Sequence, residues 1–151
     1  MFKHILVAVD ERIASARTLD AAVALAKTFG AKLELVHAVD EAQLRQARGV
    51  STDDMRNSFD AALRQEGQVT LDRGAARARE LGVEPLCRLV VSTTQHAAEQ
   101  LAEAAIASGA DLLVVGSHGA HGFTRRLLGS VADRLARTLT ISLLVVRDAE
   151  G

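Results

Sequence analysis

The sequence predicts an α/β domain built on a doubly wound parallel β-sheet with helices on both faces. Short apolar runs rich in β-branched residues alternate along the chain with longer alanine-rich segments of helical spacing. The runs are continuously apolar, which is typical of strands buried on both faces of a parallel sheet. Strands that alternate with helices require right-handed crossovers, and these crossovers place the helices against the sheet.

Five apolar runs are predicted as strands, and their order along the chain predicts a βαβαβαβαβ sequence of elements. Each run is short and is bounded by polar residues or by residues typical of turns. The predicted strands are Ile5–Val9, Leu33–Val39, Leu86–Val91, Leu112–Val115 and Ile141–Val146. The chain of 151 residues suits one domain over residues 1–151.

Each helical segment has an apolar face and a recognisable end. In the first segment, Leu19, Val23 and Ala26 share a face, and Gly30 follows as a C-terminal stop. The last segment begins at Ser130. The segment that ends at Gly109 is predicted to bury a stripe made of Ala98, Leu101, Ala102, Ala105 and Ile106.

The crossover between the second and third strands is long. Its residues 51–54, Ser-Thr-Asp-Asp, predict a helix start because their side chains accept hydrogen bonds from free backbone N–H groups. Gly67 and Gly74 each cost a helix about 1 kcal/mol relative to alanine, so the pattern leaves the continuity of this helix open. Residues 41–50 are mostly polar and are predicted as a loop.

Composition argues against several classes of function. Eighteen Lys and Arg against nineteen Asp and Glu give a net charge of −1, without the basic excess of a nucleic-acid-binding protein. No run approaches the roughly 18 apolar residues of a membrane span, and the first apolar run is too short for a signal peptide. We therefore expect a cytoplasmic protein. Cys87 is the one cysteine, so no intramolecular disulfide forms, and its apolar neighbours predict a buried thiol.

The segment from Gly116 to Ser130 is the most informative part of the sequence. It leaves the carboxyl end of a predicted buried strand and arrives at a helix start, where unpaired N–H groups and the helix dipole favour phosphate. Gly116 and Gly119 allow a ligand to approach the main chain closely. These glycines can equally form a simple turn, and Ser130 can simply cap its helix. No Lys precedes Ser130, so the segment is not a Walker A loop.

The spacing of these residues resembles a motif of the universal stress protein family. Gly116-x-x-Gly119, then nine residues, then Gly129-Ser130 is similar to that family's ATP-binding pattern G-2x-G-9x-G-[S/T]. The residues around the motif and the first strand with its Asp10 also resemble the family. The likeness covers nearly the whole chain and is strongest over residues 109–147.

The resemblance implies a fold and a ligand. The fold is a five-stranded sheet of order 3-2-1-4-5, similar to the flavodoxin-like and adenine-nucleotide α-hydrolase-like folds. The ligand is ATP or a related adenylate, held with Mg²⁺ or Mn²⁺. The implied function is a nucleotide-dependent switch in the stress response, with at most weak ATPase or autophosphorylation activity. The catalytic residues stay unassigned.

The resemblance also implies the residues of the site. Gly116 and Gly119 would line the path of the ribose and phosphates, and Gly129 and Ser130 would hold the phosphates. Asp10 would lie beside the nucleoside or beside a metal ion bound to the phosphates. The backbone at Ala38 would meet the edge of the adenine.

Two departures from the family pattern leave a second hypothesis open. Glu11-Arg12 replaces a pair of small residues after Asp10, and the loop over residues 92–96 lacks the usual Gly-x-Pro. The alternative is a dimeric interaction module whose nucleotide site is vestigial.

The last predicted strand is apolar and begins without a proline, and an exposed edge of this kind favours pairing with another chain. We expect a homodimer through Ile141, Leu143 and Val145, with an unidentified regulatory protein as a further partner. Elsewhere, His37 lies in a strand and is predicted to be a hydrogen-bonded core residue. His118 and His121 are predicted to face solvent from the glycine loop.

Overall fold

A computed structural model describes residues 1–10, 14–40, 49, 52–92, 94–117 and 128–147. The strands are β1 (His4–Ala8), β2 (Lys32–Asp40), β3 (Leu86–Ser92), β4 (Leu112–Gly116) and β5 (Ser142–Val146). The helices are α1 (Ala14–Phe29), α3 (Asp53–Glu80), α4 (Ala97–Ser108) and α5 (Ser130–Thr138). The strands form one parallel sheet of order β3-β2-β1-β4-β5, which confirms the predicted fold class.

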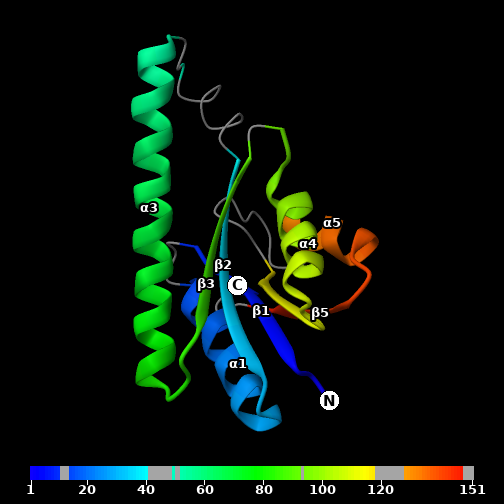
Figure 1. Cartoon of the computed structure of the whole chain (residues 1–151). Coiled ribbons are helices and arrows are strands. Elements are labelled where there is room, and N and C mark those ends of the chain that lie inside the picture. The colour runs from blue at the N-terminus through cyan, green and yellow to red at the C-terminus, as the bar shows by residue number, and fades with distance from the viewer. Residues whose placement is uncertain (11–13, 41–48, 50–51, 93, 118–127, 148–151) are drawn as a thin grey trace.

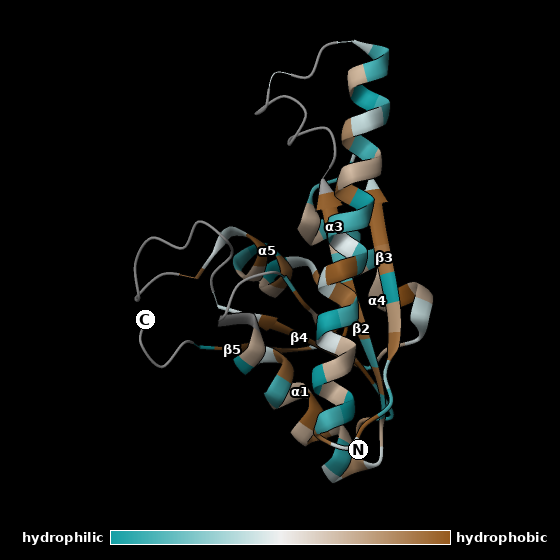
Figure 2. Cartoon of the chain, turned by 90° about the vertical axis from the view of Figure 1, so that its left-hand side faces the viewer, coloured by the Kyte–Doolittle hydropathy of each residue, from teal (hydrophilic) through white to brown (hydrophobic). Residues whose placement is uncertain are grey.

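The sheet lies between two layers of helices. In Figure 1, α1 and α3 cover one face of the sheet, and α4 and α5 cover the other. Alternate residues of each strand point to opposite faces, so Val7 packs toward α1 and α3 while Leu6 packs toward α4 and α5. Both side chains are fully buried. Figure 2 shows the strands as predominantly hydrophobic, whereas α3 carries many hydrophilic residues.

The predicted helix ends agree with the structure. Thr52 is the N-cap of α3, and its Oγ1 accepts a hydrogen bond from the Met55 amide at 3.1 Å. Gly30 has a φ of 61° and Gly109 a φ of 76°, left-handed conformations that favour glycine at a helix end.

Helix α3 runs without a break through both of its glycines. A Cβ at Gly67 would lie 2.7 Å from Leu89 Cδ1, and a Cβ at Gly74 would lie 2.7 Å from Leu35 Cδ2. Both contacts are with the sheet, so the absent side chains let the helix approach the strands closely. This close approach is the physical role of the two glycines, which helix propensity alone does not indicate.

Two burial predictions were wrong. Cys87 is exposed because β3 is an edge strand, and partial burial still raises the pKa of its thiol although the nearby Arg79 charge opposes that shift. Ile106 is 66% exposed on the outer side of α4. The face of α4 that packs on the sheet includes Gln100 and Ala104 in its place.

Candidate functional site

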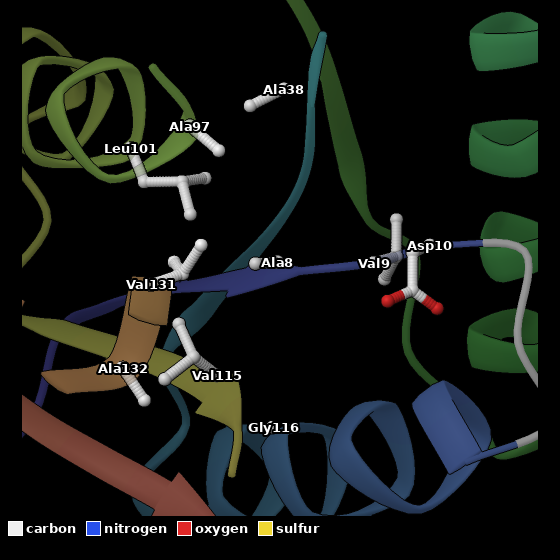
Figure 3. Close-up of a pocket in the computed structure, with 10 residues that line it drawn as sticks. All are labelled: Ala8, Val9, Asp10, Ala38, Ala97, Leu101, Val115, Gly116, Val131 and Ala132. Atoms are coloured by element: carbon white, nitrogen blue, oxygen red, sulfur yellow. The ribbon is translucent and has the colours of Figure 1, made fainter. Parts of the chain in front are cut away.

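A pocket of about 130 Å³ opens at the carboxyl ends of the strands (Figure 3). Strands β2 and β3 lie on one side of β1, whereas β4 and β5 lie on the other, so the strand order reverses between β1 and β4. Ligands of doubly wound sheets bind at such a reversal of strand order. The pocket is lined by Ala8, Val9, Asp10, Ala38, Ala97, Leu101, Val115, Gly116, Val131 and Ala132.

The pocket walls are mostly small and apolar. Ala97 and Leu101 are one helical turn apart on α4, and Val131 and Ala132 come from the first turn of α5. In Figure 3, Leu101 extends from α4 toward Val131. Small side chains leave room between the helices and the strand ends, so this part of the pocket suits a flat apolar ring better than a charged group.

Asp10 supplies the one carboxylate among the lining residues. It follows β1 directly and is half-buried. Both backbone polar groups of Val9, the residue before it, are bonded to β2: the Val9 amide donates to the Val36 carbonyl at 2.9 Å. The Val9 carbonyl in turn accepts from Nδ1 of His37 at 2.8 Å. His37 is therefore the hydrogen-bonded core histidine that the sequence predicted, and it holds the strand end that carries Asp10.

The two ends of the glycine segment meet at one hydrogen bond. The Ser117 amide donates to the Val146 carbonyl at 2.9 Å, which ties the end of β4 to β5. The Gly129 amide donates to the Ser117 carbonyl at 2.6 Å. This bond brings the start of α5 beside Gly116. Gly119 and the rest of residues 118–127 lie outside the described residues, as do Glu11 and Arg12.

The start of α5 has backbone amides of the kind that bind anions. Gly129, not Ser130, is the N-cap, so the alternative in which Ser130 caps this helix was wrong. Within the described part of the chain no side chain caps the helix, and its first backbone hydrogen bond runs from the Asp133 amide to the Gly129 carbonyl. An α-helix leaves its first amides without intrahelical partners. Because the Gly129 amide is already bonded to Ser117, the amides that could serve an anion would begin at Ser130.

The pocket residues fit an adenine nucleotide, and they fit a metal ion only together with the phosphates. The apolar slot matches a base, and the uncapped helix start matches phosphates. The one carboxylate matches either a ribose or a cation. Among the residues that the structure describes, no group of three or more His, Cys, Asp or Glu side chains is placed to hold a metal ion. Asp10 alone suits Mg²⁺ when phosphate oxygens supply the other ligands.

Sequence reasoning found three lining positions and two adjoining ones, but it missed the residues of the pocket walls that come from α4 and α5. Asp10, Ala38 and Gly116 line one pocket, and Gly129 and Ser130 stand beside it in the chain segment that supplies Val131. The sequence did not indicate the α4 and α5 wall residues. One signal was available: ligands bind at the carboxyl ends of parallel strands, and the helix that follows each strand begins there. This rule points to Ala97, the first residue of α4.

Comparisons with known proteins agree with this architecture. Residues 1–147 match the Universal stress protein family. Universal stress protein YxiE of Bacillus subtilis is 32% identical over 97% of this chain and 100% of its own. A universal stress protein family structure from Burkholderia pseudomallei is 33% identical, covers 95% of both chains and superposes with a TM-score of 0.74.

A third relative is a universal stress protein whose crystal structure is in complex with cAMP. It is 27% identical, covers 96% of both chains and superposes with a TM-score of 0.68. Within the described ranges, no helix has the length and apolarity that crossing a membrane requires. The match over nearly the full length, by sequence and by fold, shows that this chain belongs to the universal stress protein family.

Proposed function

We propose that this protein binds ATP or a related adenine nucleotide in the pocket at the carboxyl ends of β1 and β4. The observation that carries the proposal is that an apolar slot, the Asp10 carboxylate and the uncapped start of α5 adjoin one another. The relative in complex with cAMP supports an adenine nucleotide as the ligand class. The base would enter between Ala38 and Leu101. The phosphates would accept hydrogen bonds from backbone amides of the first turn of α5.

The proposed metal ion is Mg²⁺ or Mn²⁺ bound to the phosphates. Asp10 would be its protein ligand or would accept hydrogen bonds from the ribose. Gly116 and Gly119 would line the path between ribose and phosphates, and Ser130 would add its hydroxyl to a phosphate oxygen. These assignments carry the family motif onto this chain residue by residue.

Bound nucleotide would act as the signal of a cytoplasmic stress-response switch. Phosphoryl transfer needs an oriented nucleophile and charge stabilisation, and the described pocket residues offer Asp10 as their one ionisable group. We therefore propose at most weak ATPase or autophosphorylation activity. The alternative, an interaction module with a vestigial site, is favoured by one observation, the occupation of the Gly129 amide by Ser117.

Equilibrium dialysis of labelled ATP with Mg²⁺ tests the proposal. We expect saturable binding with one nucleotide per chain. Absence of saturable binding below millimolar ATP would leave the interaction module as the better description. A nucleotide retained through purification and identified by mass spectrometry would name the adenylate.

We also propose a homodimer through the edge of β5. The Val146 carbonyl points to β4, where it accepts from Ser117, so the amide and carbonyl of Val145 point to the open side of the strand. Val145→Pro removes one edge donor, and proline is tolerated on an edge strand. We expect light scattering to show a dimer for the wild type and a shift toward monomer for this variant. A wild-type monomer at micromolar concentration would contradict the proposal.

A further inference from the structure

We propose that Gln100 is a positioning residue that holds the base-binding end of the nucleotide pocket in shape. The inference rests on the proposed function, because it concerns the same pocket. Gln100 does not line that pocket, and its effect is exerted through the two chain segments that it joins.

Gln100 is a polar side chain in an apolar setting. It is fully buried on the face of α4 that packs on the sheet, beside Leu101 and Ala104. Its Nε2 donates to the Val39 carbonyl at 3.0 Å and to the Gln95 carbonyl at 2.9 Å. The opposite amide orientation would set Oε1 against two carbonyl oxygens, so the hydrogen bonds fix which atom is the nitrogen.

These two hydrogen bonds join two walls of the pocket. Val39 follows Ala38, which lines the pocket from β2. Gln95 lies in the turn that leads through His96 into Ala97, which lines the pocket from α4. A single side-chain amide therefore sets the separation of the strand end and the helix start between which the base would enter.

The turn held by Gln100 is also held from its other side. Ser92 Oγ accepts from the Gln95 amide at 2.9 Å and from the Thr94 amide at 3.1 Å. Gln95 is thus bonded through its amide to the end of β3 and through its carbonyl to α4. These bonds fix Thr94 and Gln95 against the end of β3.

The arrangement is not the one that stability alone favours. Oε1 of Gln100 is buried without a hydrogen-bond partner among the described residues. A buried unpaired acceptor is unfavourable, and an apolar side chain of similar size would avoid it. A role in pre-organising the pocket accounts for the presence of an amide at this position.

The test is Gln100→Met, which keeps the size of the side chain and removes both donors. We expect its affinities for ATP and for adenosine to fall by a similar factor, about tenfold, because the altered wall meets the base and not the phosphates. Thr70→Val is the matched control, a buried polar residue of α3 that bonds to the Glu66 carbonyl on the other face of the sheet. We expect wild-type affinity from this control.

A pH profile separates positioning from a general loss of structure. In Gln100→Glu the carboxylate faces two carbonyl oxygens in a buried setting, which raises its pKa. Only the protonated form carries a donor, so the affinity of Gln100→Glu relative to Gln100→Met is expected to rise as the pH falls from about 8 to about 5. The neighbouring ionisable groups are the same in both variants and cancel in the ratio: the N-cap His96, Glu99 of α4 with its partner Arg134 of α5, and Asp40 at the end of β2.

Ser92→Ala provides a second variant at a position that is not fully buried, so we expect it to fold as the wild type does. We expect a smaller loss of affinity in the same direction. If the wild type binds ATP while Gln100→Met and Ser92→Ala bind it equally well, the positioning role is wrong and the proposed function stands. If the wild type binds neither ATP nor adenosine, the proposed function itself fails.

Discussion

Ala38→Leu is expected to weaken nucleotide binding strongly while the protein stays folded. Ala38 lines the pocket from the end of β2, and three added carbon atoms would occupy space within a pocket of about 130 Å³. Forcing a ligand against such extra atoms costs up to about 3 kcal/mol, so we expect the affinities for ATP and adenosine both to fall by about 100-fold. Isothermal titration calorimetry measures both affinities.

Ala62→Leu is the matched control for this prediction, since Ala62 is exposed on α3 and away from the pocket. We expect it to bind ATP as the wild type does. Thermal unfolding of Ala38→Leu should be cooperative, because leucine suits an apolar strand position. Tight ATP binding by a cooperatively folded Ala38→Leu would place the base elsewhere.

Ser130→Pro is expected to weaken ATP binding without weakening adenosine binding. Ser130 is the first residue of α5, where proline is accepted because its amide has no intrahelical partner. Gly129 has a φ of −63° and a ψ of 161°, a conformation that a following proline favours. A hydrogen bond to a charged group contributes about 1.5–3 kcal/mol, so the loss of this amide should lower ATP affinity by about tenfold to 100-fold.

Two further variants isolate the amide. Ser130→Ala removes the hydroxyl and keeps the amide, so its smaller loss of ATP affinity measures the hydroxyl alone. Asp53→Pro places proline at the same position of α3, after an N-cap with a ψ of 158°, and should leave ATP affinity unchanged. Equal ATP affinities for Ser130→Pro and Ser130→Ala would mean that the phosphates do not use this amide.

The main elements of the fold were predictable because they depend on short stretches of chain. Continuous apolar runs gave each strand to within one residue at either end, since a strand buried on both faces has few polar positions. Gly30 and Gly109 marked helix ends because a left-handed residue is a local requirement. The motif around Gly116 and Gly129 pointed to the end of the sheet where the pocket lies, because the spacing of a motif is visible in the chain.

Tertiary structure alone decided the contacts between distant segments. Gly67 and Gly74 are unfavourable for helix propensity, and only the close contact of α3 with the sheet explains them. Cys87 has the apolar neighbours of a buried residue, but it is exposed because β3 lies at the edge of the sheet. In the sequence, Gln100 is an ordinary polar residue of a helix. In the fold its side chain donates to the Val39 carbonyl, which is 61 residues away in sequence. The sequence by itself determined the strands and the helix ends, because these follow from local backbone preference and hydrophobic periodicity, and its motif indicated the region of the candidate site. The walls of the pocket and the hydrogen bonds that hold them depend on which elements become neighbours, and only the packed sheet decides that.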